Sequence, residues 1–218
     1  MYKTILFDLD GTILHTISDI TIALNVSLKA CGYDFSYDDE GTKKLIGMGA
    51  RNIIARAFKN RSHTTQEFDR LLEVFTTNYK IYQGQTARPY EGIIELLNDL
   101  KGRGIKLLVA SNKPDHLAKE IVKRIFGLDL FDDIYGHQVG KPEKPDPYLV
   151  DYLLDKHQIN HEETLFVGDS DVDVATGINS SLKVALVTWG YGDYNEELLK
   201  KATYVVNSVS ELKSIVFA

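Results

Sequence analysis

Short apolar runs rich in β-branched residues alternate with helical stretches over most of the chain. The runs are nearly continuous, which is typical of strands that are covered by helices on both faces. They lie at Thr4–Leu9, Ile105–Ser111, Asp133–Gly136, Thr164–Gly168, Val184–Val187 and Tyr204–Val206. Helices are predicted between them at Ile93–Arg103, His116–Phe126, Tyr148–His157, Val172–Asn179 and Asn195–Lys201. This order predicts an α/β fold, a doubly wound parallel sheet with right-handed crossovers.

The segment from residue 16 to residue 84 interrupts the alternation, because it contains no convincing strand. Apolar positions at three- and four-residue spacing predict helices there at Ser18–Cys31, Ala50–Asn60 and Thr65–Tyr82. Ser18 and Thr65 are candidate N-caps of the first and last of these helices. We therefore expect an all-helical insertion at residues 16–84 in an α/β core formed by residues 1–15 and 85–218.

Composition narrows the class of protein. Among 218 residues, 25 Lys and Arg stand against 31 Asp and Glu, a formal net charge of −6. Broad binding to nucleic acid or to an anionic membrane needs a basic face, so neither is expected. The only cysteine, Cys31, excludes an internal disulfide and a cysteine-based zinc site. The start of the chain does not resemble a signal peptide, and no run is long enough to span a membrane. We expect a cytoplasmic monomer or homodimer.

Polar clusters follow four of the predicted strands. Each has a structural explanation when taken alone: solvated turn acids, helix caps or a Pro-rich loop. In an open parallel sheet, however, the carboxyl ends of the strands form the ligand-binding edge, so the clusters should meet there. Carboxylates there can bind Mg²⁺, and a hydroxyl and a lysine can hold phosphoryl oxygens. The clusters, which together favour a magnesium phosphotransfer site, are Asp8–Thr12, Ser111–Pro114, Gly140–Pro147 and Gly168–Asp173.

These clusters resemble, in order, the four motifs of the haloacid dehalogenase superfamily of aspartate-nucleophile phosphatases. The helical insertion after the first motif is similar to the small helical cap of that superfamily, on a Rossmann-like core. The third cluster contains two Lys-Pro pairs, and only Lys144-Pro145 continues as Lys-Pro-Asp-Pro. Lys144, rather than Lys141, is therefore identified with the family's lysine.

The resemblance implies a role for each matching residue. Asp8 would be the nucleophile that forms an aspartyl-phosphate, and Asp10 would be the general acid and base. Lys144 would orient Asp8, while Ser111 and the backbone N–H groups of Gly11 and Asn112 would hold phosphoryl oxygens. Mg²⁺ would be bound by the Asp8 carboxylate, the Asp10 backbone carbonyl and Asp169, with Asp173 as a further ligand or as an outer anchor.

Four further stretches resemble the phosphoglycolate phosphatase branch of this superfamily: Ile46–Gly49, Arg88–Gly92, Ser111–Pro114 and Val187–Tyr191. The branch implies a small phosphorylated metabolite, such as 2-phosphoglycolate, as the substrate. Arg51 and Lys113 are then candidates to bind the carboxylate of the substrate. The chain departs from its relatives at Tyr191 and Gly192, where a basic residue is common.

Other functions are compatible with the same motifs. One is a sugar-phosphate mutase, although Thr12 favours hydrolysis because valine is common at this position in the mutase branch. Another is a phosphatase of a different small ester, including pyrophosphate or a nucleoside monophosphate. A third is a non-catalytic phosphate-binding protein or a receiver-like switch that uses Asp8 as its phosphoacceptor. Asp10 and the Gly-Asp-Ser cluster would be superfluous in such a switch.

Overall fold

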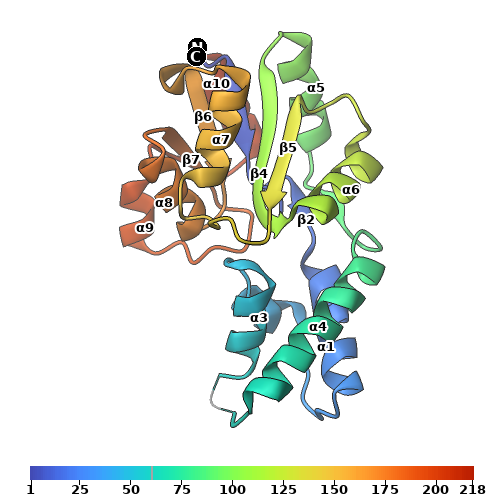
Figure 1. Ribbon diagram of the computed structural model, residues 1–218. Coiled ribbons are helices and arrows are strands. Elements are labelled where there is room, and N and C mark those ends of the chain that lie inside the picture. The colour runs from blue at the N-terminus through green and yellow to red at the C-terminus, as the bar shows by residue number, and fades with distance from the viewer. Residues whose placement is uncertain (60) are drawn as a thin grey trace. The chain divides into compact units, whose positions relative to one another are not determined.

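The computed structural model describes residues 1–59 and 61–218, so the last residue of the expected Ala50–Asn60 helix lies outside the described residues. The chain divides into two compact units (Figure 1). One comprises Met1–His15 and Pro89–Ala218, and the other comprises Thr16–Arg88. The second crossing between the units thus falls between Arg88 and Pro89, at the end of the stretch from Gly84 to Pro89 where the sequence suggests it.

The first unit is built on a six-stranded parallel sheet with the strand order β5-β4-β1-β6-β7-β8. The doubly wound α/β fold predicted from the sequence is confirmed. Leu6 of the central strand β1 lies opposite Leu108 of β4 and Phe166 of β6. The strands are β1 (Thr4–Phe7), β4 (Lys106–Pro114), β5 (Asp133–His137), β6 (Thr164–Gly168), β7 (Lys183–Val187) and β8 (Tyr204–Val206).

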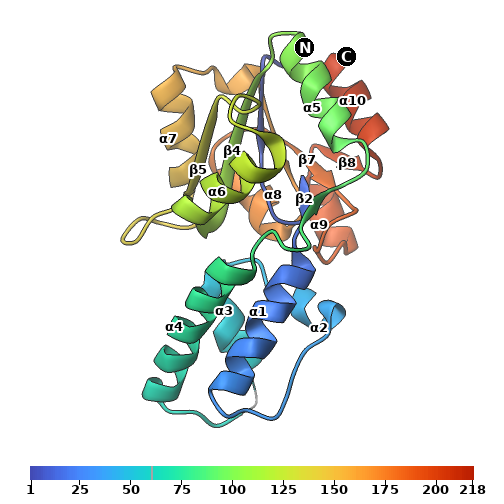
Figure 2. The ribbon, with the colours of Figure 1, turned by 90° about the vertical axis from the view of Figure 1, so that its right-hand side faces the viewer.

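Helices cover both faces of this sheet, which explains the nearly continuous apolar runs in its strands. Helix α7 lies on one face, and α5 and α10 lie on the other (Figure 2). Leu6 and Phe166 pack with Leu153 of α7 in one buried cluster. Full burial of each such side chain contributes about 1.5–3 kcal/mol. The helices are α5 (Ile93–Gly102), α6 (Asp115–Phe126), α7 (Tyr148–His157), α8 (Asp171–Asn179), α9 (Glu196–Lys201) and α10 (Val209–Phe217), with a 3₁₀ turn at His161–Glu163.

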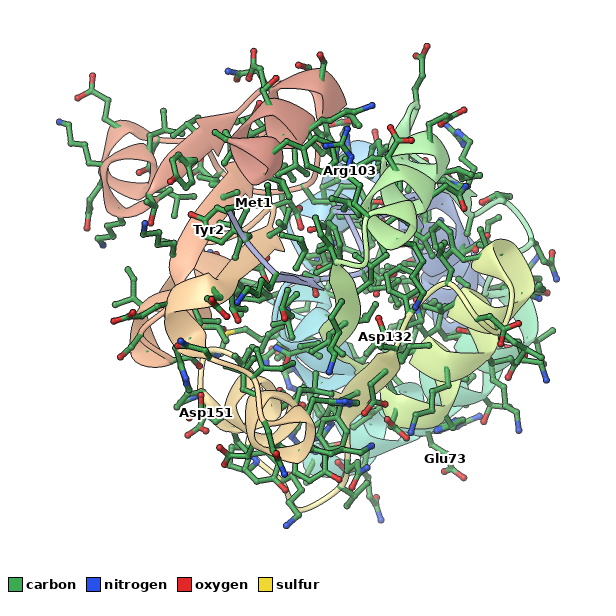
Figure 3. The ribbon with its side chains drawn as sticks, turned by 90° about the horizontal axis from the view of Figure 1, so that it is seen from above. Met1, Tyr2, Glu73, Arg103, Asp132 and Asp151 are labelled. Atoms are coloured by element: carbon green, nitrogen blue, oxygen red, sulfur yellow. The ribbon has the colours of Figure 1, made fainter. Side chains whose placement is uncertain are left out.

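All strands of the sheet run in the same direction, so its two edges differ in chemistry. Figure 3 views the unit from the edge where the strands begin: Tyr2, Arg103 and Asp132 shortly precede β1, β4 and β5. The opposite edge collects the carboxyl ends of the strands, and every predicted polar cluster follows a strand at that edge.

The second unit is helical, as its sequence pattern predicts. Helices α1 and α4 pack side by side through buried residues that include Leu24 and Phe75. Two short strands, β2 (Leu14–His15) and β3 (Arg88–Pro89), pair with each other. The helices are α1 (Ile17–Ala30), α2 (Asp39–Lys43), α3 (Gly49–Ala57) and α4 (Thr65–Tyr82). Among the described residues, no helix combines the length and the apolar character needed to cross a membrane.

Both predicted N-caps of this unit are wrong by one or two positions. The N-cap of α1 is Thr16, and the Ser18 hydroxyl instead donates to Oδ2 of Asp39 at 2.6 Å. The N-cap of α4 is Thr64, whose side chain and that of Glu67 form a reciprocal capping box. The Thr-x-x-Glu spacing that defines such a box favours Thr64 over its neighbour.

Candidate active site

Three buried carboxylates meet at the carboxyl edge of the sheet. Asp8 follows β1, Asp169 follows β6, and Asp173 lies in the first turn of α8. One carboxylate oxygen from each lies within 4.8 Å of the others. Because β1 and β6 are neighbours in the sheet, their ends bring Asp8 and Asp169 together although the two are far apart in the sequence.

Lys144 supplies a positive charge inside this group. Its Nζ lies 2.6 Å from Oδ1 of Asp8, 2.7 Å from Oδ1 of Asp173 and 3.0 Å from the carbonyl oxygen of Ala110. The residue is only 2% exposed. The competing Lys141 is exposed, and its Nζ lies over the ring of Tyr148. Of the two Lys-Pro pairs, only the second therefore brings its lysine to the carboxylates.

The side chain of Asn112 positions this lysine. Its Nδ2 donates to the carbonyl oxygen of Lys144 at 2.9 Å, and its Oδ1 accepts from the backbone N–H of Lys144 at 2.7 Å. The pair of bonds fastens the loop before α7 to the end of β4. The sequence suggested only the backbone N–H of Asn112 as a phosphate contact, and the structure adds this anchoring contact of its side chain.

Ser111 and Lys113 lie on the same strand end, next to Asp10. The Ser111 side chain is buried, and its Oγ accepts from the backbone N–H of Lys113. The Nζ of Lys113 lies 3.5 Å from Oδ1 of Asp10. The Lys113 side chain is 1% exposed and that of Asp10 is 21% exposed. Asp10 is therefore the more accessible member of a pair formed with a buried ammonium group.

Asp173 has protein partners for both carboxylate oxygens. Oδ1 accepts from Lys144, while Oδ2 accepts from the Ser170 hydroxyl at 2.6 Å and from the backbone N–H groups of Asp169 and Ser170. Ser170 and Asp173 form a capping box at the start of α8. This geometry fits an outer anchor better than a residue whose oxygens are open to a ligand.

Asp169 is held from two sides. The Thr12 hydroxyl donates to its Oδ1 at 3.0 Å, and the backbone N–H of Tyr191 donates to its Oδ2 at 2.7 Å. Gly11 lies close by with φ +93°, and a Cβ at that position would stand 2.4 Å from Oδ2 of Asp169. The sequence did not predict that Thr12 and Tyr191 contact this carboxylate. The glycines that flank Tyr191 could have indicated this contact, because glycine is favoured where the backbone approaches another group closely.

Burial and neighbouring charges shift the pKa values of the ionisable groups in the site. Burial raises the pKa of Asp8 to about 7, although Lys144 lowers it. Burial, with the charges of Asp173 and Asp8, also raises the pKa of Asp169 well above its usual range. Burial alone would lower the pKa of Lys144, but Asp173 and Asp8 outweigh it and raise that pKa.

The donor set fits a hard divalent cation. The carboxylates of Asp8 and Asp169, with Asp173 beside them, offer oxygen atoms only. Oxygen atoms are the ligands that Mg²⁺ prefers, and they suit Zn²⁺ less well than histidine or cysteine does. One lysine does not balance three buried carboxylates, and a bound cation would favour their ionised forms. The residues present therefore fit the magnesium ion predicted from the sequence.

Arg51 lies on α3 of the helical unit, whereas the residues described above belong to the other unit. Its guanidinium lies 3.8 Å from Oδ1 of Asp69 and 4.9 Å from the centre of the Phe68 ring, both within the same unit. Its side chain is 68% exposed. A role for Arg51 in binding substrate stays a prediction.

Comparison with known proteins gives consistent matches. A family model described as haloacid dehalogenase-like hydrolase matches residues 5–187. A phosphoglycolate phosphatase of Aquifex aeolicus (strain VF5) is 35% identical over 196 residues, which cover 90% of this chain and 89% of the relative. A phosphoglycolate phosphatase of Rhodospirillum rubrum is 33% identical over 88% of this chain and 81% of the relative.

Solved structures share the architecture. The crystal structure of a predicted phosphoglycolate phosphatase from Haemophilus somnus 129PT superposes with a TM-score of 0.89 at 27% identity, covering 98% of this chain and 97% of that one. Together with the sequence matches, it confirms the resemblance that the motifs predicted, to a superfamily of phosphatases and to its phosphoglycolate phosphatase branch.

Proposed function

The chain belongs to the haloacid dehalogenase-like hydrolases, and on this premise we propose that it hydrolyses a small phosphate monoester with Mg²⁺ through an aspartyl-phosphate at Asp8. The observation that carries the proposal is the contact of Lys144 with both Asp8 and Asp173 beside Asp169. That arrangement supports the proposal, because it would bring a nucleophilic carboxylate, the buried ammonium group of Lys144 and hard oxygen ligands for a metal ion close together. Covalent catalysis would divide a very slow hydrolysis into two easier steps.

In the first step, a carboxylate oxygen of Asp8 attacks phosphorus, and the bond between phosphorus and the ester oxygen breaks. Asp10 donates its proton to the leaving alkoxide. In the second step, Asp10 removes a proton from a water molecule, which attacks phosphorus and releases phosphate and the free Asp8 carboxylate. Such general acid–base catalysis typically contributes about 10²–10⁴-fold in rate. The 21% exposure of the Asp10 side chain suits a group that must meet substrate and water.

The remaining residues would hold charge in place. Lys144 fixes Asp8 for attack, and Ser111 with the N–H groups of Gly11 and Asn112 would bind phosphoryl oxygens. Asp8, Asp169 and the Asp10 carbonyl would hold Mg²⁺, with Asp173 as the outer anchor. The ion, when bound, would neutralise charge between the anionic nucleophile and the anionic ester.

We propose 2-phosphoglycolate as the substrate, with support from the relatives named phosphoglycolate phosphatase. The position of Lys113 supports it further. In this ester the carboxylate stands on the carbon that carries the ester oxygen, so it would lie near the proton donor of the leaving group. Lys113 presents a buried ammonium 3.5 Å from Asp10, at such a position. Arg51 is the second candidate for this carboxylate.

The test is a panel of phosphate esters assayed with purified protein, with Mg²⁺ or with EDTA. We expect Mg²⁺-dependent phosphate release with the highest kcat/KM on 2-phosphoglycolate. The Lys113→Ala variant should raise KM for 2-phosphoglycolate more than KM for p-nitrophenyl phosphate, which has no carboxylate, and Arg51→Ala is tested alongside. Similar rates on many esters would contradict the substrate and leave the phosphatase. Phosphate release that needs a sugar bisphosphate would instead indicate a mutase.

A further inference from the structure

Two loops that are not neighbours in the sheet meet around Asp169. One runs from Asp8 to Ile13 after β1, and the other follows β7 and begins at Thr188. The indole Nε1 of Trp189 donates to the carbonyl oxygen of Thr12 at 3.0 Å. A Cβ on Gly190 would stand 2.4 Å from the carbonyl oxygen of Gly11. The loops are therefore in direct backbone contact, with the end of β6 between them.

Each loop holds one oxygen of the Asp169 carboxylate. The first loop supplies the Thr12 hydroxyl to Oδ1, and the second supplies the Tyr191 N–H to Oδ2. The orientation of the carboxylate thus depends on the spacing between the loops. The Trp189 bond ends on the carbonyl of Thr12, the same residue whose hydroxyl contacts Asp169. The Trp189 hydrogen bond therefore links the loop that carries the Thr12 hydroxyl to the loop that carries the Tyr191 N–H.

We propose that Trp189 is a positioning residue, whose indole N–H sets the spacing of these loops and thereby the orientation of Asp169 toward a divalent cation. The inference rests on the proposed function in one respect, the assignment of Asp169 as a ligand of Mg²⁺. Partners that orient metal ligands typically change metal affinity by about 10–100-fold when they are removed. Trp189 acts one bond further out, so a smaller effect is expected.

A chain of aromatic rings supports Trp189 in this position. The Trp189 ring lies 6.3 Å from that of Tyr90, Tyr90 lies 5.7 Å from His15, and His15 lies 5.9 Å from Tyr191. The series thus starts at Trp189 and ends at Tyr191, both on the loop after β7. Between them it passes through His15, which follows the β1 loop, and Tyr90. Edge-to-face aromatic pairs contribute beyond their buried area. Replacing Trp189 by Phe keeps an aromatic ring in this series and removes the N–H donor together with the five-membered part of the indole.

The test measures Mg²⁺ binding by isothermal titration calorimetry without substrate, in the parent protein, Trp189→Phe and Tyr204→Phe. The last variant removes a hydroxyl contact at the opposite edge of the sheet, 3.1 Å between the Tyr2 and Tyr204 oxygens. We expect the Kd for Mg²⁺ to rise about 3–10-fold in Trp189→Phe and to stay unchanged in Tyr204→Phe. In turnover, Trp189→Phe should need more Mg²⁺ for half-maximal rate, while kcat at saturating Mg²⁺ stays within about 2-fold of the parent value.

An unchanged Kd for Mg²⁺ in Trp189→Phe would overturn the inference. This holds even if the melting temperature of the variant falls, because a purely structural role of Trp189 predicts a lower melting temperature and no change in Kd. A parent protein that binds no Mg²⁺ would overturn it too. The proposed function fails separately: if the parent binds Mg²⁺ but releases phosphate from no ester, a weaker Kd in Trp189→Phe still supports the positioning role.

Discussion

The Nζ atom of Lys144 lies 2.6 Å from Oδ1 of Asp8. The same atom lies 2.7 Å from Oδ1 of Asp173, so one buried ammonium group joins the end of β1 to the start of α8. Because Asp173 also caps α8 through its other oxygen, the position of Lys144 is fixed by the fold itself. The proposed nucleophile is thus held by a partner that has little freedom to move.

Replacing Lys144 by Met should remove activity and destabilise the protein together. Asp8 and Asp173 would then be buried carboxylates without their cation, and breaking a buried ion pair from one side costs about 3–5 kcal/mol. Lys141→Met is the matched control, since Lys141 is exposed in the same loop. The melting temperature and the rate of phosphate release should both fall in Lys144→Met and stay near the parent values in Lys141→Met. Equal melting temperatures and equal activities of the two variants would show that Lys144 does not hold these carboxylates.

Gly11→Ala should impair the site through a clash as well as through backbone strain. Its Cβ would stand 2.4 Å from Oδ2 of Asp169, and its φ of +93° is unfavourable for alanine. Gly104→Ala separates the two effects, because Gly104 also has a positive φ but has no atom within 4 Å of its added Cβ. Gly104→Ala should lose about 1–2 kcal/mol of stability and keep its activity. Gly11→Ala should lose activity by more than tenfold in the phosphate-release assay.

Removing Mg²⁺ should stop phosphate release and lower the melting temperature. A ligand that binds only the folded state stabilises it by about 2.7 kcal/mol when its concentration is 100 times Kd. The parent protein should therefore melt at a higher temperature with Mg²⁺ than with EDTA, and Asp169→Asn should lose most of this difference. If the two proteins respond alike to Mg²⁺, the ion does not bind at these carboxylates.

Asp133 should make stability depend on pH in the acid range. Burial alone would raise its pKa, but hydrogen bonds from Lys156, His157 and the N–H of Ile134 outweigh burial and lower that pKa. A carboxyl with a lowered folded pKa contributes stability above its unfolded pKa of about 3.9, and the contribution is lost as pH falls through the folded pKa. Half of the Lys156 side chain is exposed, so we expect only about 1 kcal/mol.

The measurement is the free energy of unfolding of the parent and of Asp133→Asn between about pH 3 and pH 6. The difference between them should be largest at pH 6 and should shrink toward pH 3. Asp155→Asn, which changes an exposed carboxylate of α7, controls for net charge. A difference that is constant with pH, or that grows on acidification, would contradict this role of Asp133.

The sequence was sufficient to predict which strands end at the site, because each motif follows an apolar run. It also separated Lys144 from Lys141, since only the former is followed by Lys-Pro-Asp-Pro. It could not predict that Thr12 and Tyr191 hold Asp169, because that contact depends on the spacing of loops on non-adjacent strands. Such spacing is set by tertiary packing and leaves no periodic pattern in the sequence.

Two helices were missed for different reasons. Helix α2 has five residues and contains Gly41, so it shows too little periodicity to be detected. Helix α10, in contrast, has a recognisable start in the sequence. Ser208 caps it by accepting from the N–H of Glu211, and the Glu211 carboxylate accepts from the N–H of Asn207. This Ser-x-x-Glu spacing, like the Thr64 box, is a local rule that predicts where a helix begins better than apolar spacing does.

Asp8 should become phosphorylated during turnover. The most direct measurement is mass spectrometry of peptides from protein that is quenched in acid while it hydrolyses 2-phosphoglycolate with Mg²⁺. We expect a phosphoryl group on Asp8 in the parent protein and none in Asp8→Asn. Asp10→Asn should accumulate more of it, because that variant cannot activate water for the second step. Turnover by the parent with no phosphoryl group on Asp8 in either the parent or Asp10→Asn, or with Asp8→Asn active at the parent rate, would contradict it.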